Sequence, residues 1–312
     1  MWGNVVIDRE ALKNVSFVLF DVVQRLGFFL FPIHYYVPLT PTRQLRATKE
    51  IWNRPIDVTY LPMSDAAQRE VLVGWIKPFE PEYRGNRTFL EATQNRAGPG
   101  YGYIEAQALH GFVRKTKPRH VIEVGSGVST ACMLAALRAN QAESGQPFEI
   151  TCIEPNPYAS LTEGSVKLIP EPVERTDLSV FDQLEAGDLL FIDSSHAVRP
   201  CGDVARIYLE IMPRLKSGVY VHIHDIYIPY SFGRRVHESY LQWMETALLI
   251  AALAHSNRYN VLLCTSYMHY ADPKALRDAF PEYLPQTNDG GLRGDASGTD
   301  RHFPSSTYLV VR

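Results

Sequence analysis

Residues 120–130 read HVIEVGSGVST, a short apolar run followed by a glycine loop. The run His120–Val124 predicts a buried strand, and the two glycines allow the backbone to turn tightly beside a ligand. A dinucleotide-binding loop would carry a third glycine at position 130, where this chain has Thr130. The carboxyl group of Glu123 would repel a pyrophosphate and suits a cationic ligand. The stretch therefore predicts a strand, a ligand-binding loop and a helix, without the dinucleotide pattern.

The rest of the chain alternates short apolar runs with helical patterns. We expect further strands at residues 149–153, 166–173, 188–192, 218–224, 259–265 and 307–311. We expect helices at residues 101–117, 129–140, 178–184, 203–215 and 243–254, and a polar loop at 141–148. This order predicts an α/β fold with a Rossmann-like, mostly parallel sheet of seven strands, an antiparallel last strand and helices on both faces.

The candidate site follows from the ends of these strands. Ligands bind such sheets outside the carboxyl ends of the strands, and polar side chains follow those ends here. The segments concerned are Glu123–Ser129, Glu154, Asp193–His196 and His224–Asp225. Glu154 can accept hydrogen bonds from both hydroxyls of a ribose. The glycines could instead form only a tight turn and Glu154 only a cap, but their joint occurrence favours a ligand site.

The motifs resemble a known enzyme family. The loop E-V-G-S-G and the E-P-N after the second strand are typical of class I S-adenosylmethionine-dependent methyltransferases. The stretches GPGYGYIEAQAL, LLFIDSSHAV, PRLKSGVYVHIHDIYIPY and SSTYLVVR are similar to one bacterial subfamily with the methyltransferase-24 type of domain. The resemblance covers about residues 98–312 and is looser over 28–60. It implies transfer of a methyl group from S-adenosylmethionine to a small-molecule acceptor, with a hydroxyl oxygen as the expected acceptor atom.

The resemblance also implies which residues bind the cofactor. The glycine loop would line the methionine side, Glu154 the ribose, and Val173 with Glu174 the adenine edge. Asp193 would lie at the sulfonium end. The cofactor-binding set is therefore expected to be Glu123, Gly125, Ser126, Gly127, Ser129, Glu154, Val173, Glu174 and Asp193.

Histidines and carboxylates gather after the fourth and fifth strands. Because these strands are expected to be neighbours, Asp193, His196, His224 and Asp225 should converge. In one interpretation His196 or His224 is a general base, assisted by Asp225. In the other, Asp193, His224 and Asp225 hold a divalent metal, with His222 as a further candidate ligand or, alternatively, a core histidine. His224 stands where related metal-dependent families carry a carboxylate, which favours iron, manganese or zinc over magnesium.

Two other functions remain open at this point. A metal-dependent oxidative enzyme on the same fold could use His222 and His224 with Asp225 or Asp193 as a two-histidine, one-carboxylate set. A non-catalytic binding protein could keep the fold without the chemistry. The intact glycine loop and the polar strand ends argue against a non-catalytic protein.

Composition sets limits on partners and location. The 312 residues carry a net charge of −3 and no long basic run, so we expect a small-molecule substrate and no nucleic acid. The cysteines are scattered without a CxxC pair, which is typical of reduced thiols in a cytoplasmic protein.

The N-terminal hundred residues are the least regular part of the chain. We expect residues 1–100 to form a cap on the substrate side or an oligomerisation segment, and residues 101–312 to form the methyltransferase domain. Residues 16–33 predict an amphipathic helix that packs on its own protein or on a second subunit of a homo-oligomer, with peripheral membrane contact as the alternative. Residues 269–305 predict a loop or lid that moves at Gly290, Gly291 and Gly294.

Overall fold

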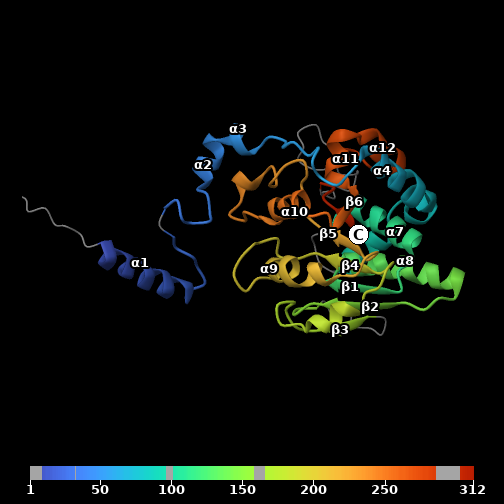
Figure 1. Cartoon of the computed structure of the whole chain (residues 1–312), viewed down its shortest axis with the longest axis horizontal. Coiled ribbons are helices and arrows are strands. Elements are labelled where there is room, and N and C mark those ends of the chain that lie inside the picture. Colours follow the sequence, from blue (N-terminus) through green and yellow to red (C-terminus); the bar gives the residue numbers. More distant parts are fainter. Residues whose placement is uncertain (1–8, 32, 96–100, 158–165, 286–302) are drawn as a thin grey trace, which may run out of the picture. The chain divides into compact units, whose positions relative to one another are not determined.

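The computed structural model describes residues 9–31, 33–95, 101–157, 166–285 and 303–312 (Figure 1). The chain forms two compact units. The smaller contains residues 1–52 and 235–242, and the larger contains 53–234 and 243–312. The structure therefore groups residues 53–95 with the larger unit, whereas the sequence pattern predicts a boundary at residue 100.

The larger unit is built on a sheet of seven strands in the order β3-β2-β1-β4-β5-β7-β6. All neighbouring pairs are parallel except those of β7, which runs antiparallel to both β5 and β6. The strands are β1 His120–Val124, β2 Glu149–Ile153, β3 Lys167–Ile169, β4 Leu189–Ile192, β5 Tyr220–Ile223, β6 Tyr259–Cys264 and β7 Thr307–Val311. The predicted fold class, including the antiparallel last strand, is confirmed.

Helical segments accompany the sheet in the larger unit (Figure 1). The α-helices are α4 Asp65–Glu70, α5 Glu80–Tyr83, α6 Arg87–Gln94, α7 Tyr103–Thr116, α8 Val128–Ser144, α9 Asp203–Arg206, α10 Glu245–Ala254, α11 Thr265–Ala271 and α12 Pro273–Ala279. Shorter 3-10 and π segments are η1 Val71–Ile76, η2 Lys77–Phe79, η4 Leu178–Gln183, η5 Ile207–Ile211 and η6 Met212–Arg214.

Side chains that alternate along the strands form two cores, one on each face of the sheet. In β4, Leu189 and Phe191 belong to the core that contains α7 and α8, and Leu190 and Ile192 belong to the core that contains α10. Because both faces are buried, every residue of β4 is apolar. Helices thus cover both faces, and the carboxyl ends of the parallel strands are left to carry the polar groups.

Several element boundaries differ from the sequence prediction. β3 is shorter than predicted because Pro170 and Pro172 cannot donate to a ladder. α8 continues to Ser144, so half of the predicted loop 141–148 is helical, and Gly145 ends the helix with a φ of +70°. The predicted loop 269–305 begins with helical residues of α11 and α12. The glycines named as its hinges, Gly290, Gly291 and Gly294, lie outside the described residues.

The smaller unit begins with α1 Arg9–Gln24, followed by α2 Thr42–Ala47, α3 Lys49–Trp52 and η7 Val236–Glu238. The predicted helix 16–33 is therefore wrong beyond Gln24, because the chain turns at Gly27 with a φ of +82°. Arg25 and Asp21 form the i,i+4 ion pair that the sequence spacing predicts, at 3.0 Å. Beyond the turn, Phe29 and Phe31 stack on each other, and both rings contact the ring of Phe20 in a tilted arrangement.

Large apolar side chains of this segment remain exposed, including Phe28 and Phe29. Among the described residues, no helix has both the length and the apolar character that crossing a bilayer requires. Association with a second copy and contact with a membrane surface both stay predictions.

Candidate functional site

The glycine loop after β1 has the conformation that its sequence predicts. Gly125 has a φ of +112°, in the left-handed region that side chains disfavour. A β-carbon at this position would lie 3.0 Å from the carbonyl oxygen of Asp193. The backbone N–H of Gly125 donates to the carbonyl of Ile153 at 3.0 Å, which joins the loop to the end of β2. Both the turn and the close approach therefore require glycine.

Glu123 lies beneath this loop. Its side chain is fully buried and accepts hydrogen bonds from Ser129 Oγ and Thr130 Oγ1, each at 2.6 Å. Burial raises its pKa to about 7, against the opposing effect of these hydrogen bonds. The carboxylate of Glu123 and the hydroxyl of Ser129 contact each other and hold the start of α8 against the end of β1, and their contact with a cofactor stays a prediction.

Other predicted cofactor-binding residues stand around the same edge. Ser126 Oγ is buried and has no hydrogen-bond partner among the described residues. Glu154 follows β2, is half-buried and accepts the backbone N–H of Asn156 at 2.8 Å. Val173 is buried in the core, and Glu174 beside it is half-buried. An orphaned hydroxyl at the loop and a carboxylate at the next strand end are groups that an adenosyl ligand would satisfy.

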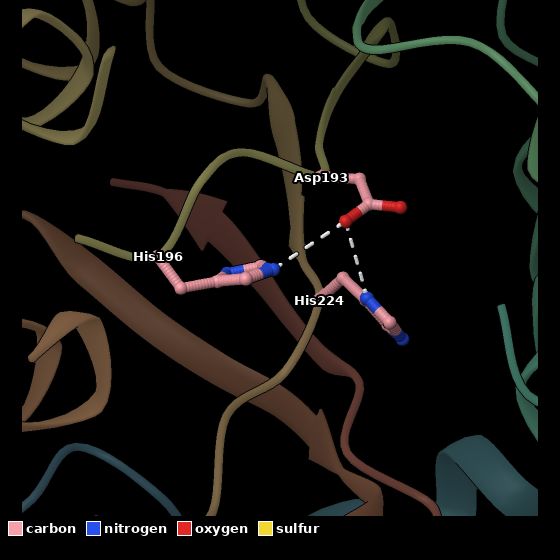
Figure 2. Close-up of side chains that lie close together, drawn as sticks. All are labelled: Asp193, His196 and His224. Atoms are coloured by element: carbon pink, nitrogen blue, oxygen red, sulfur yellow. Dashed lines mark hydrogen bonds and ion pairs between the residues drawn. The ribbon is translucent and has the colours of Figure 1, made fainter. Parts of the chain in front are cut away.

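Asp193, His196 and His224 come together where β4 and β5 end (Figure 2). Asp193 Oδ1 lies 3.6 Å from His196 Nε2 and 3.2 Å from His224 Nδ1. Asp225 closes the arrangement, since its Oδ2 lies 3.6 Å from His196 Nε2 and 3.9 Å from His224 Nδ1. The predicted convergence of these residues is what the geometry shows.

Two of these residues have unusual backbone conformations. His196 has a φ of +58° and Asp225 a φ of +53°. Left-handed conformations cost about 1–3 kcal/mol for residues other than glycine and often occur at functional sites. The carboxylate of Asp225 accepts hydrogen bonds from Tyr227 Oη at 3.1 Å and Ser305 Oγ at 2.9 Å, which hold it in place.

Two buried glutamates that sequence reasoning missed complete the cluster. Glu245 Oε2 lies 2.7 Å from His196 Nδ1, and Glu105 Oε2 lies 3.3 Å from His224 Nε2. Both glutamates are fully buried. The only signal for Glu105 was its position in the stretch GPGYGYIEAQAL, and Glu245 begins a helix predicted from its apolar pattern alone.

The carboxylates determine the charge of the imidazoles. Burial lowers the pKa of His196, but the neighbouring carboxylates of Asp193, Glu245 and Asp225 outweigh burial and raise it to about 10. Burial is likewise outweighed at His224, where the charges of Asp225 and Glu105 hold the pKa well above its usual value. The two cationic imidazoles in turn lower the pKa of Asp193 against the effect of its burial.

His222 does not belong to this cluster. Its ring stacks on Phe191 at 4.2 Å, and its Nε2 lies 3.0 Å from Ser306 Oγ and 3.4 Å from Tyr101 Oη. Burial holds its pKa well below the usual value, so the ring is neutral. The structure therefore gives His222 the place of a core histidine, the alternative that the sequence left open, and His196 lies in the cluster as predicted.

Comparison with known families identifies the segment that carries the glycine loop. Residues 122–226, which run from β1 past the end of β5, match the family model described as "Methyltransferase domain", of the methyltransferase-24 type. The chain therefore contains a methyltransferase domain of this type. The matched segment of the methyltransferase contains the glycine loop and all four members of the Asp193–Asp225 arrangement, and it leaves out Glu105 and Glu245.

The methyltransferase also has individual relatives. An uncharacterised protein from Archaeoglobus fulgidus is 24% identical over 200 residues, which cover 58% of this chain and 87% of the relative. A proposed caffeoyl-CoA O-methyltransferase from Staphylococcus aureus is 17% identical, with a TM-score of 0.41 over 62% of this chain and 91% of that one. The mycinamycin-pathway methyltransferase MycE, solved with Mg and S-adenosylhomocysteine, is 13% identical, with a TM-score of 0.36 over 72% and 54% of the two chains.

Proposed function

We propose that this methyltransferase acts on a hydroxyl oxygen of a small-molecule acceptor with the help of a divalent metal held by Asp193, His196 and His224, with Asp225 beside it. The observation that carries the proposal is the ring of four ligand atoms at the ends of β4 and β5. Adjacent atoms of this ring are 3.2–3.9 Å apart.

These separations fit ligands around an ion. Nitrogen–oxygen hydrogen bonds are usually about 2.7–3.2 Å long, so most contacts in the ring are too long for direct hydrogen bonds. Ligands about 2.0–2.2 Å from one ion lie roughly 3–3.5 Å from each other, so the contacts of 3.6 and 3.9 Å would shorten slightly around a bound ion. Two imidazole nitrogens among the donors favour zinc, manganese, iron or cobalt over magnesium. A metal at this place would keep both imidazoles neutral, because a ligating nitrogen must be free of its proton.

The cofactor edge supports the other half of the proposal. S-adenosylmethionine supplies a methyl group on a positively charged sulfur. The Gly125–Gly127 loop, with the unpartnered Ser126 Oγ, would hold the methionine side, Glu154 the ribose, and Val173 with Glu174 the adenine edge. The four ring residues would bind the acceptor oxygen through the metal, lower its pKa and exclude water from it.

The alternative mechanism has no metal and uses a histidine as the general base. His196 or His224 would then take the acceptor proton directly. In the absence of a metal the surrounding carboxylates raise the pKa of His196 and favour its protonated form, which opposes that role, whereas a bound cation would displace the proton. We therefore assign the histidines to metal binding first.

An oxidative enzyme is the second candidate, because the cluster contains two histidines and one aspartate. The set differs from the one predicted, since His196 replaces His222. Redox-inactive zinc separates the two functions. Methyl transfer supported by zinc favours the methyltransferase proposal, whereas metal-dependent oxygen consumption that only iron supports favours the oxidative enzyme.

Two titrations test the proposed function independently. Calorimetry with S-adenosylhomocysteine should show binding that Glu154→Ala weakens and Asp225→Asn leaves largely intact. Calorimetry with Zn²⁺ or Mn²⁺ on chelator-treated protein should show one equivalent bound, which Asp193→Asn abolishes and Glu154→Ala retains. Loss of the cofactor titration would contradict the cofactor site, and loss of the metal titration alone would leave a metal-free methyltransferase.

A further inference from the structure

Each imidazole of the cluster turns its second nitrogen toward a buried glutamate. His196 uses Nδ1 for Glu245 at 2.7 Å and presents Nε2 to the ring. His224 uses Nε2 for Glu105 at 3.3 Å and presents Nδ1 to the ring. The two histidines therefore use opposite nitrogens. In both cases the imidazole nitrogen that faces away from Asp193 and Asp225 contacts a carboxylate.

We propose that Glu105 and Glu245 are positioning residues. They determine which imidazole nitrogen of His224 and of His196 faces the proposed metal site. An imidazole that donates its outer N–H to a carboxylate keeps its inner nitrogen free to bind a metal. The inference rests on the proposed metal site and extends it to two residues outside the ring.

Glu245 is coupled to His196 through the backbone as well. The carbonyl of His196 accepts the N–H of Met244 at 3.0 Å and that of Glu245 at 3.3 Å. The glutamate side chain also accepts the hydroxyl of Ser194 at 3.1 Å. The start of α10 therefore holds both the main chain and the ring of His196, whose left-handed φ needs such support.

Glu105 belongs to α7, which packs on the face of the sheet opposite to α10. Its Oε1 accepts the backbone N–H of Ser305 at 3.1 Å and the hydroxyl of Ser306 at 2.7 Å. These donors fix the orientation of the carboxyl group in α7, so that Oε2 points at His224. Each histidine thus has its own support, one from α7 and one from α10.

The contacts of Glu105 make its glutamine variant informative. In Glu105→Gln, the N–H of Ser305 needs an acceptor, so the amide oxygen must occupy the Oε1 position. The amide NH₂ then points at His224 Nε2 and donates to it. This favours the tautomer with its proton on Nδ1, which faces the ring and opposes a cation. The variant thus moves the imidazole proton of His224 from Nε2 to Nδ1 while the side chain at position 105 keeps its size.

The test measures the Zn²⁺ affinity and the imidazole N–H protons of the same set of proteins. Zn²⁺ affinity is measured by calorimetry on wild type, Glu105→Gln, Glu245→Gln and the control Asp188→Asn. Proton spectra of the Co²⁺-loaded proteins show exchangeable ring N–H signals of bound histidines. Asp188 is a matched control: it is buried, accepts the backbone N–H groups of Arg119 and His120, and contacts His120 Nδ1 at 3.2 Å, before β4 rather than after it.

The two glutamine variants should each bind Zn²⁺ roughly 10–100-fold more weakly than wild type, as is typical when a supporting carboxylate is lost. Wild type should show two exchangeable signals, with one missing in each variant. Asp188→Asn should keep both signals and its affinity within about twofold, whatever its loss of thermal stability. Affinities of the glutamine variants that match Asp188→Asn would overturn the inference and leave the metal site standing. A wild type that binds no ion would overturn the proposed site and this inference with it.

Discussion

The carbonyl oxygen of Asp193 stands over Gly125, 3.0 Å from the position that a β-carbon would occupy. The backbone N–H of Asp193 donates to the carbonyl of Val124 at 3.0 Å, so the strand ends are held together on both sides of this contact. The glycine loop and the residue that opens the histidine–carboxylate cluster are therefore packed directly against each other. A change at Gly125 should disturb both the cofactor loop and the cluster.

Gly125→Ala should weaken binding of S-adenosylhomocysteine at least about tenfold and destabilise the fold by about 1–3 kcal/mol. The added methyl group meets the Asp193 carbonyl, and its backbone conformation is strained. Gly145→Ala is the matched control, because Gly145 also has a positive φ but would meet no atom within 4 Å. Calorimetry should show normal ligand affinity for Gly145→Ala despite a similar stability loss. Equal ligand affinities in the two variants would show that the contact with Asp193 does not shape the loop.

Glu123 should make the stability of the protein depend on pH. Its carboxyl has a pKa of about 7 when folded and about 4.5 when unfolded, so the folded protein holds the proton more tightly. The resulting stabilisation is complete below pH 4.5 and is lost as the pH rises to about 7 and beyond. The shift corresponds to about 3 kcal/mol.

Glu123→Gln removes this dependence. Urea unfolding of chelator-treated protein at pH 4.5 and pH 8 should therefore show the variant gaining up to about 3 kcal/mol relative to wild type at the higher pH. The comparison with wild type cancels the titration of His196 and His224, which is common to both proteins. A difference between the two proteins that stays constant over this range would mean that Glu123 is ionised throughout.

The sequence predicts the sheet well because its pattern is local. All seven strands fall within the expected runs, since parallel strands buried on both faces must be short and apolar. Boundaries set by capping residues are less visible, as α8 shows by running on to Gly145. The turn that ends α1 before Phe28 is a similar case, because a single glycine decides it within an apolar run.

The site is predicted only where its residues follow strands. Asp193, His196, His224 and Asp225 converge because β4 and β5 are neighbours, a relationship that the fold class implies. Glu105 and Glu245 belong to helices far away in the sequence, and nothing in their local pattern predicts a contact with a histidine. The sequence shows only a glutamate within or beside an apolar helical run, which indicates that the group needs a partner but does not say which one.

His196 and His222 provide a direct test of the proposed ligand set. His196→Gln should lower Zn²⁺ affinity by more than the roughly 10–100-fold typical of a supporting residue, because a ligand itself is lost. His222→Gln should keep Zn²⁺ affinity within about threefold while it lowers thermal stability, because His222 packs on Phe191 and contacts Ser306. Circular-dichroism melting and calorimetry measure the two properties. Metal loss in His222→Gln with a folded protein would restore His222 as a ligand.

The two aspartates of the ring should contribute unequally. Asp193 Oδ1 lies within 3.6 Å of both inner imidazole nitrogens, whereas Asp225 Oδ2 lies at 3.6 and 3.9 Å and its other oxygen already accepts from Tyr227 and Ser305. Asp193→Asn should therefore abolish Zn²⁺ binding, and Asp225→Asn should weaken it by about tenfold and lower kcat more than it raises KM for the cofactor. Calorimetry on both chelator-treated variants measures the order of these effects. The reverse order would place the ion on the Asp225 side of the ring and make Asp193 the outer carboxylate.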